Sequence, residues 1–124
     1  MIYRVTDPAD ANRIYEEHDL TALVEDRRNV FLSNGRDLAV FAWRGPGVFE
    51  GHLHFTSRGR EAIGVGKAML AEMPKYGARM IWGPTPVHMR NVRWFQRQLG
   101  LVSHGIMATP EGDCELFVME NLCL

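Results

Sequence analysis

Hydrophobic and polar residues change their spacing once in the middle of the chain. The polar side chains of Glu50, His52 and His54 alternate with Leu53 and Phe55, which is the period of a half-buried strand. After residue 61 the apolar positions recur at helical spacing, at Ala62, Ile63, Gly66, Met69, Leu70 and Met73. This change predicts a strand over residues 48–56, a corner at Arg58-Gly59-Arg60, and a helix that ends at Pro74 and Gly77.

The same criteria predict the other elements. Thr6-Asp7-Pro8 combines a capping side chain with a proline, which predicts a helix running to about residue 18. Asn34-Gly35 predicts a hairpin between strands 29–33 and 37–43. Further strands are expected at residues 2–5, 78–83, 101–108 and 114–120, and further helices at 20–25 and 88–99. Pro84-Thr85-Pro86 is expected to stop the strand 78–83.

The helix expected over residues 88–99 carries two stripes of side chains. An apolar stripe is expected to face the core and consists of Val92, Phe95 and Leu99. A basic stripe is expected to face solvent, or alternatively adenosine phosphates or a nucleic acid, and consists of Arg90, Arg93 and Arg97.

The resulting order is β-α-α-β-β-β-α-β-α-β-β. Antiparallel strands come first, and a βαβ crossover follows in the middle of the chain. We therefore expect an α/β (α+β mixed) fold with a mixed, mostly antiparallel sheet of six or seven strands flanked by about four helices. The length of 124 residues is that of a single domain spanning residues 1–124.

Composition and charge narrow the setting of the protein. Lys and Arg number 14 and Asp and Glu 15, so the formal charge of −1 makes a nucleic-acid partner unexpected. The two cysteines, Cys114 and Cys123, form neither a disulfide framework nor a metal-ligand spacing. No stretch approaches the roughly 18 apolar residues of a membrane span, and the first residues lack the apolar core of a signal peptide. A reduced, cytoplasmic setting without a membrane partner is the expectation.

The corner between the central strand and helix has the chemistry of an anion site. The N–H groups at the start of a helix have no partner within the helix and lie at the positive end of its dipole. Arg58 and Arg60 add two guanidinium groups at the same place. Phosphate is the usual occupant of such a corner.

These patterns resemble the GNAT superfamily of acyl-CoA-dependent N-acetyltransferases. The resemblance rests on the element order, on the Arg58-Gly59-Arg60 corner with the later Gly64-Val-Gly66, and on Asn91-Val-Arg-Trp-Phe-Gln-Arg-Gln-Leu-Gly-Leu101. More narrowly, Glu50-Gly51-His52 before Phe55, and Gly83-Pro-Thr-Pro86 before Asn91, resemble small GNAT-like proteins encoded in phages and prophages.

The resemblance implies acetyl-CoA as co-substrate and a set of residues that would hold it. Its pyrophosphate would contact the amides between Arg58 and Gly66, and its pantetheine arm would lie between the strands near residues 55 and 80–83, helped by Asn91. The implied cofactor-binding residues are Phe55, Thr56, Arg58, Gly59, Arg60, Glu61, Ala62, Gly64, Gly66 and Asn91.

Two registers of the pyrophosphate corner are open. Matching the glycines of the family pattern aligns Gly64 and Gly66 but puts Glu61 where Arg or Gln belongs, and it leaves a helix of barely ten residues. Matching Arg58 gives a full-length helix but puts Glu61 and Ile63 at the glycine positions. The second register is favoured because the apolar stripe already begins at Ala62.

Three side chains on one face of the central strand are candidates for catalysis. An unperturbed His titrates near 6.5, so His52 is the first choice for a general base, with Glu50 second and His54 beside them. The plainer interpretation is that all three form the polar face of a strand. The family's usual acid is a Tyr at the position occupied here by Gln96, which has no acidic proton.

Three functions are weighed. The leading one is direct transfer of an acetyl group from acetyl-CoA to an amine of an unknown acceptor, small molecule or protein. The second is a non-catalytic GNAT-fold binding or structural protein, as in a phage particle, which Gln96 favours. The third is a nucleic-acid module using the basic stripes. No metal site is expected, because His52 and His54 lack a third ligand. A homodimer is compatible with the sequence.

Overall fold

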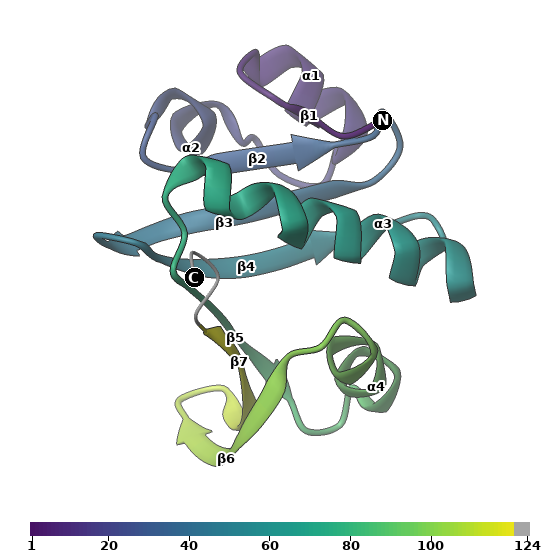
Figure 1. The fold of residues 1–124 in the computed structure, drawn as a ribbon, viewed down its shortest axis with the longest axis vertical. Helices are drawn as coiled ribbons and strands as arrows, with labels where there is room; N and C mark the ends of the chain where they lie inside the picture. Colours follow the sequence, from purple (N-terminus) through teal and green to yellow (C-terminus); the bar gives the residue numbers. More distant parts are fainter. Residues whose placement is uncertain (121–124) are drawn as a thin grey trace.

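The computed structural model describes residues 1–120, which form one seven-stranded sheet with helices on both faces (Figure 1). Cys123 lies outside the described residues. The strands are β1 (Tyr3–Arg4), β2 (Val30–Ser33), β3 (Leu38–Gly45), β4 (Val48–His54), β5 (Met80–Pro86), β6 (Val102–Thr109) and β7 (Gly112–Glu120). The helices are α1 (Pro8–Ile14), α2 (Thr21–Glu25), α3 (Gly59–Glu72), the 3₁₀ helix η1 (Met73–Tyr76) and α4 (Arg90–Gln98). The predicted order and the mixed fold class are confirmed.

The strand order in the sheet is β1-β2-β3-β4-β5-β7-β6, and every neighbouring pair is antiparallel except β4 and β5. The crossover from β4 to β5 runs through α3, as a parallel pair requires. Figure 1 shows α3 lying across β3 and β4, while β5, β7 and α4 extend away from them. The sheet therefore has two halves joined at β4 and β5.

Alternation along the strands divides the core between the two faces of the sheet. Phe31, Leu38 and Val40 pack with α1 and α2, in a cluster that also contains Ala11 and Val24. The residues that alternate with them along β2 and β3 point the other way, into a larger cluster: Val30, Leu32, Ala39 and Phe41. This cluster also contains Met69 of α3 and Met73 of η1. The strands are buried on both faces here because helices cover both.

The structure corrects the predicted end of β5. Pro84 and Pro86 do not stop the strand, which pairs with β7 as far as Pro86 opposite Cys114. The Met80 N–H donates to the Gly47 carbonyl at 3.0 Å, so even-numbered residues of β5 direct their N–H side toward β4. Both prolines occupy even positions beyond the last pair with β4. They interrupt no ladder hydrogen bond, because β4 has diverged and this side of β5 is unpaired there, as at the edge of a sheet.

The first helix is shorter than predicted. It ends at Ile14, and the backbone of Tyr15 is already extended, with φ −124° and ψ 96°. The ring of Tyr15 stacks on His54 of β4, with ring centroids 4.0 Å apart. The helix therefore ends at a residue whose side chain makes a tertiary contact that sequence periodicity does not report.

The two stripes of α4 are also partly reversed. Val92 is 41% exposed rather than inward, whereas Leu99 is buried as predicted. Arg93 and Arg97 face the sheet, where they bind the two carboxylate oxygens of the buried Glu115 at 2.7 Å each. These two arginines therefore attach α4 to β7 and are not a free solvated stripe.

Two glycines are required by close packing or backbone shape. A Cβ on Gly66 of α3 would lie 2.6 Å from Leu99 Cδ2, so this glycine lets the end of α4 approach α3. Gly77 ends η1 in the left-handed region at φ 86°, and its N–H donates to Pro74 O at 3.0 Å.

Candidate active site

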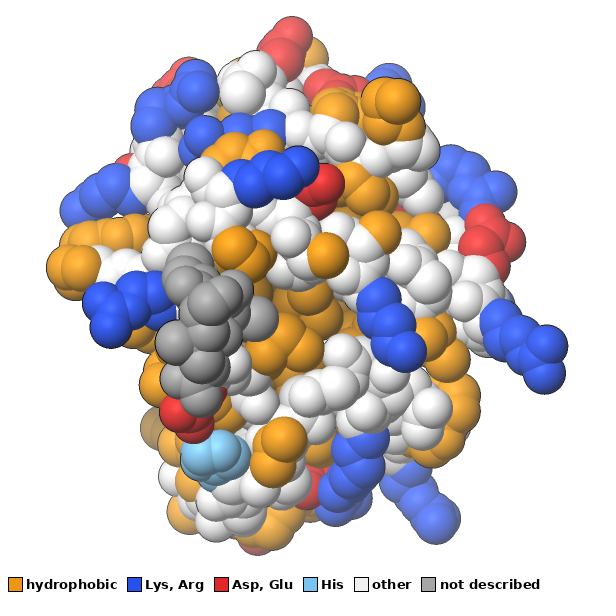
Figure 2. Space-filling view, viewed as in Figure 1, with side chains coloured by type: hydrophobic (Ala, Val, Ile, Leu, Met, Phe, Trp, Pro, Cys, Tyr) orange, Lys and Arg blue, Asp and Glu red, His pale blue; other side chains and the backbone are white. Residues whose placement is uncertain are grey.

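A cleft of about 830 Å³ opens where β4 and β5 separate. The two strands pair only at Val48–Met80, Phe49–Ile81 and Glu50–Trp82. Immediately beyond, a Cβ on Gly83 would lie 3.2 Å from the Gly51 carbonyl oxygen, so glycine permits the close approach at the point of divergence. The cleft is lined by residues 51–55, 57–59, 62, 84–86, 89, 91, 92 and 94–96. In Figure 2, orange apolar side chains line the middle of the viewed face, between the upper and lower parts of the molecule.

At one end of the cleft, α3 begins directly at Gly59, with Arg58 as its N-cap residue. No side chain caps this end, and the first described backbone bond of the turn is from Ala62 N–H to Arg58 O, at 3.4 Å. The N–H groups of Gly59, Arg60 and Glu61 therefore have no described partner. The full-length α3 agrees with the register that matches Arg58.

The Arg58 guanidinium turns back onto the corner. Its Nη1 donates to the carbonyls of Phe55, Thr56 and Ser57 at 3.0, 3.4 and 3.2 Å. The Phe55 carbonyl therefore already accepts a hydrogen bond from Arg58. The pantetheine arm was expected to pair with backbone groups close to this residue. The remaining guanidinium N–H groups of Arg58, and the exposed Arg60, add positive charge at the helix start.

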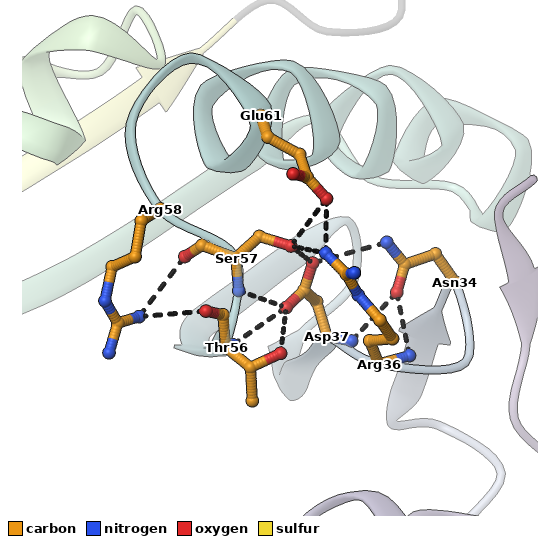
Figure 3. Close-up of polar contacts among 7 residues, drawn as sticks. All are labelled: Asn34, Arg36, Asp37, Thr56, Ser57, Arg58 and Glu61. Atoms are coloured by element: carbon orange, nitrogen blue, oxygen red, sulfur yellow. Dashed lines mark hydrogen bonds and ion pairs between the residues drawn. The ribbon is translucent and has the colours of Figure 1, made fainter.

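The corner is held by a buried aspartate that the sequence analysis did not identify (Figure 3). Asp37, in the turn between β2 and β3, is 0% exposed. Its Oδ1 accepts hydrogen bonds from the N–H of Thr56 at 2.8 Å and of Ser57 at 3.0 Å. Its Oδ2 accepts from the Ser57 hydroxyl at 2.6 Å and the Asn34 amide at 3.3 Å. Asp37 therefore fixes the backbone of the two residues that precede Arg58.

The same hydrogen bonds keep Asp37 ionised. Burial opposes ionisation, but the hydrogen bonds from Ser57, Thr56 and Asn34 outweigh it and hold the pKa of the Asp37 carboxyl below its usual value. Arg36 of the same turn donates to the Ser57 hydroxyl at 2.8 Å and forms an ion pair with Glu61 of α3. Glu61 is thus directed at Arg36 across the helix start (Figure 3).

Toward the other end of the cleft lie the three polar residues of β4. His52 Nε2 lies 2.6 Å from Glu50 Oε2, and Arg44 Nε donates to Glu50 Oε1 at 3.2 Å. The Glu50 side chain is 15% exposed and that of His52 44% exposed, so the histidine is the more accessible member of the pair. His52 and His54 line the cleft, and Glu50 lies behind His52.

His54 has a different environment from His52. Burial against neighbouring groups, together with the nearby His52 and His18, lowers the pKa of His54, and Glu17 offsets this only in part. Tyr15 stacks on His54 and donates from its hydroxyl to Glu17 Oε2 at 3.1 Å. Burial and the hydrogen bond to Glu17 raise the pKa of Tyr15. A neutral His54 therefore forms an aromatic wall with Tyr15.

The third wall of the cleft comes from α4. Phe95 makes an edge-to-face contact with Phe55 of the corner, with centroids 6.0 Å apart. Asn91 and Gln96 also line the cleft, and Gln96 Nε2 would lie 4.0 Å from a Cβ on Gly83. The carboxamide of Gln96 therefore occupies the position at which the GNAT resemblance implies a tyrosine acid.

The structure brings most of the predicted residues together. Those that line the cleft are His52, His54, Phe55, Arg58, Gly59, Ala62 and Asn91. Thr56, Arg60 and Glu61 belong to the corner but not to the described lining. Gly64 and Gly66 lie farther along α3, and Gly66 is buried against Leu99. Among residues 1–120, no group of three or more His, Cys, Asp or Glu side chains is arranged to hold a metal ion.

Comparison with known proteins identifies the architecture. No family model and no curated protein matches the chain in sequence. Solved structures do match: the acetyltransferase YncA of Salmonella typhimurium, described as putative and crystallised with its cofactor acetyl-CoA, has a TM-score of 0.74 at 16% identity, over 97% of this chain and 92% of that one. Spermidine/spermine N-acetyltransferase SpeG of Vibrio cholerae has a TM-score of 0.78 at 9% identity, over 98% and 94%. A GNAT-family acetyltransferase of Streptococcus pneumoniae has a TM-score of 0.65 at 14% identity, over 97% and 98%.

The chain has the GNAT fold. The matches cover 97–98% of this chain and 92–98% of each matched chain, so the GNAT architecture accounts for the described sheet from end to end. Identities of 9–16% extend the likeness to the fold alone. In the described GNAT fold no helix has the length and hydropathy needed to cross a lipid bilayer.

Proposed function

We propose that the protein is an acetyl-CoA-dependent N-acetyltransferase that transfers an acetyl group directly to an amine. The observation that carries this proposal is a single cleft with different chemistry along its length. Unpaired N–H groups of the first turn of α3 lie at one end, and an oriented histidine lies toward the other. The N–H groups suit an anionic cofactor, and the histidine suits an amine that must lose a proton. Acetyl transfer requires both in one cleft.

The residues present fit coenzyme A. The N–H groups of Gly59, Arg60 and Glu61 would bind its pyrophosphate, because a helix N-terminus favours anions by roughly 0.3–2 kcal/mol. Arg60, which has no described partner, would add charge-assisted hydrogen bonds. On the β5 side, alternation directs the Pro84 carbonyl into the cleft, where it can accept from an amide N–H of the pantetheine arm. Phe55 and Phe95 would cover the arm's apolar part.

Acetyl-CoA supplies an acetyl thioester, and the chain's own residues prepare the acceptor. Glu50 accepts a hydrogen bond from Nε2 of His52, which leaves Nδ1 without its proton and able to accept one from an approaching ammonium or amine. Arg44 holds Glu50 in turn. The Tyr15–His54 wall would confine the acceptor beside His52.

The alternative proposal is a GNAT-fold binding protein without catalysis, and Gln96 favours it. A carboxamide cannot protonate a departing thiolate, so a proton would have to come from water or from another tyrosine. The narrower resemblance to phage-encoded proteins supports a structural role of this kind. A cytoplasmic setting belongs to both proposals and is supported by the low cysteine count. Both proposals are also compatible with a homodimer.

Thermal unfolding with acetyl-CoA tests the shared element of the two proposals. Ligand at 100 times its Kd stabilises the folded state by about 2.7 kcal/mol and should raise Tm by several degrees. Absence of any shift at millimolar acetyl-CoA would contradict both. Where binding is found, release of free coenzyme A thiol with a panel of primary amines separates them: turnover identifies the enzyme, and tight binding without turnover over the panel identifies the binding protein.

A further inference from the structure

A second cavity, of about 300 Å³, lies at the far end of α3 from the corner. We call it the arginine pocket and define it by Arg4, Arg27, Arg28, Trp43, Phe49 and Tyr76. It shares no lining residue with the cleft between β4 and β5. Figure 2 shows basic side chains gathered around apolar ones at the upper left of the viewed face, where Figure 1 places α2 and the start of β2.

Two arginines of the pocket are held by aromatic rings. The Arg4 guanidinium carbon lies 5.1 Å from the centroid of the Tyr76 ring, and that of Arg28 lies 4.8 Å from the Trp43 ring. Cation–π contacts restrict the guanidinium groups without consuming their N–H donors. The arginines are therefore positioned before any ligand arrives.

The donors of these arginines are only partly used. Arg4 donates from Nη2 to the carbonyls of Arg27 and Asn29 at 3.1 Å each, and its Nε and Nη1 groups have no described acceptor. Arg28 uses Nε and Nη2 on Asp26, at 3.0 and 2.8 Å. Within residues 1–120 the Arg27 side chain has no hydrogen-bond or ion-pair partner. Unused, fork-shaped donors from two different segments thus surround one cavity.

The positive charge of the arginine pocket and the aromatic residues at its base indicate which kind of ligand would fit. Three arginines line the cavity, and one of them, Arg28, is paired with the carboxylate of Asp26, which leaves an excess of two positive charges. A phosphate monoester carries about −1.5 to −2 at pH 7 and matches this excess, whereas a carboxylate carries −1. The floor contains Phe49, which is 3% exposed, and Trp43, so an apolar or planar body can be covered as well. The volume is at the small end of ligand pockets.

We propose that the arginine pocket binds a small phosphate monoester attached to a planar or apolar body. The site is separate from the acetyl-CoA cleft, so it stands whether or not the protein is an acetyltransferase. It also assigns a binding role to Arg4, Arg27 and Arg28, none of which lines the cleft.

Isothermal titration of the full chain with phenyl phosphate tests the proposal, with inorganic phosphate and benzoate as comparison ligands. Phenyl phosphate should bind at least fivefold more tightly than either, because only it satisfies both the charge and the floor. Arg27→Ala should weaken phenyl phosphate at least fivefold, and the Arg27→Ala/Arg28→Ala double variant further. Lys67→Ala, which removes one exposed positive charge from α3, should bind as the wild type does.

Arg27 and Arg28, the two substituted arginines, are exposed, so the variants should fold, and an unchanged circular dichroism spectrum and Tm would verify this. Failure of phenyl phosphate to bind at millimolar concentration would overturn the proposal. Equal binding of benzoate or inorganic phosphate would overturn the ligand class. Weakening by Arg60→Ala, or tighter binding of a single-stranded oligonucleotide with the same dependence on Arg27, would assign the signal to the corner or to nucleic acid instead.

Discussion

The Asp37 carboxylate accepts a 2.6 Å hydrogen bond from the Ser57 hydroxyl and so joins the turn between β2 and β3 to the start of α3. The two residues are 20 positions apart in the chain. Because Asp37 also binds the N–H groups of Thr56 and Ser57, the amides that remain free at the helix start are those after Arg58. The position of the candidate phosphate site therefore depends on a residue outside the corner itself.

Asp37→Asn should therefore weaken both stability and acetyl-CoA binding. The amide retains one acceptor oxygen and points an NH₂ group at groups that are themselves donors, which leaves buried polar groups unsatisfied at a cost of about 1–3 kcal/mol. Chemical denaturation measures the loss, and titration with acetyl-CoA measures the affinity. Asp113→Asn, an exposed change of the same chemistry, is the control and should leave both unchanged. Equal stability of the two variants would contradict the structural role of Asp37.

The ionisation of Asp37 also makes a prediction for pH. Its folded-state pKa is lowered below that of the unfolded chain, which is about 3.9. Its stabilisation should therefore be fully present above about pH 4 and be lost as the pH falls through the lower folded pKa. The difference in unfolding free energy between wild type and Asp37→Asn should stay level from pH 5 to 8 and shrink below about pH 4. A difference that grows on acidification would have the wrong sign.

His52→Gln tests the proposed base. Glutamine fills a similar volume but cannot take up a proton, so turnover should fall about 10²- to 10⁴-fold. Acetyl-CoA binding should be unchanged, because the described side-chain hydrogen bond of His52 is to Glu50 and not to the helix start. His104→Gln, on the exposed strand β6, is the matched control. If binding and turnover fell together, His52 would be a structural residue.

Gln96→Tyr tests whether the cleft lacks only a proton donor. The residue lines the cleft near Gly83, and a phenol there could protonate a leaving thiolate. We expect kcat to rise several-fold while acetyl-CoA affinity stays within about threefold. Gln96→Phe supplies the ring without the hydroxyl and should not raise kcat. A gain with both variants would point to packing instead of proton transfer.

Two glycines of α3 should respond in opposite ways to alanine. A Cβ on Gly64 meets nothing within 4 Å, so Gly64→Ala should stabilise the protein by about 0.5–1 kcal/mol through helix propensity. A Cβ on Gly66 would lie 2.6 Å from buried Leu99, and Gly66→Ala should destabilise by about 1–3 kcal/mol despite the same propensity gain. Urea unfolding of both variants decides, and stabilisation by Gly66→Ala would mean that Leu99 is free to move.

Local patterns predicted most of the fold. The hairpin at Asn34-Gly35 and the crossover around residue 62 depend on turn chemistry and periodicity, which neighbouring residues determine, and both are present. The length of α1 and the facing of α4 could not be predicted in this way. Tyr15, at the end of its helix, stacks on His54, and Arg93 turns inward to bind the buried Glu115. Both partners are far away in the sequence.

In the candidate site, too, local sequence predicted some residues and distant contacts determined others. The corner and the row from Glu50 to His54 follow from spacing, and the structure places His52, His54, Arg58 and Asn91 around one cleft. Asp37 and Tyr15 were not predicted, because each contacts the site from another element. An aspartate two residues after Asn34-Gly35 also has an ordinary explanation in turn chemistry, so no local signal distinguished it.

Pro84 and Pro86 have a consequence for the energy of ligand binding. Neither proline has an N–H to donate to β4, so the two strands cannot complete a full ladder of main-chain hydrogen bonds where they diverge. A ligand entering between them breaks no strand pairing. Ligand binding at the prolines therefore does not have to offset the loss of ladder hydrogen bonds between β4 and β5.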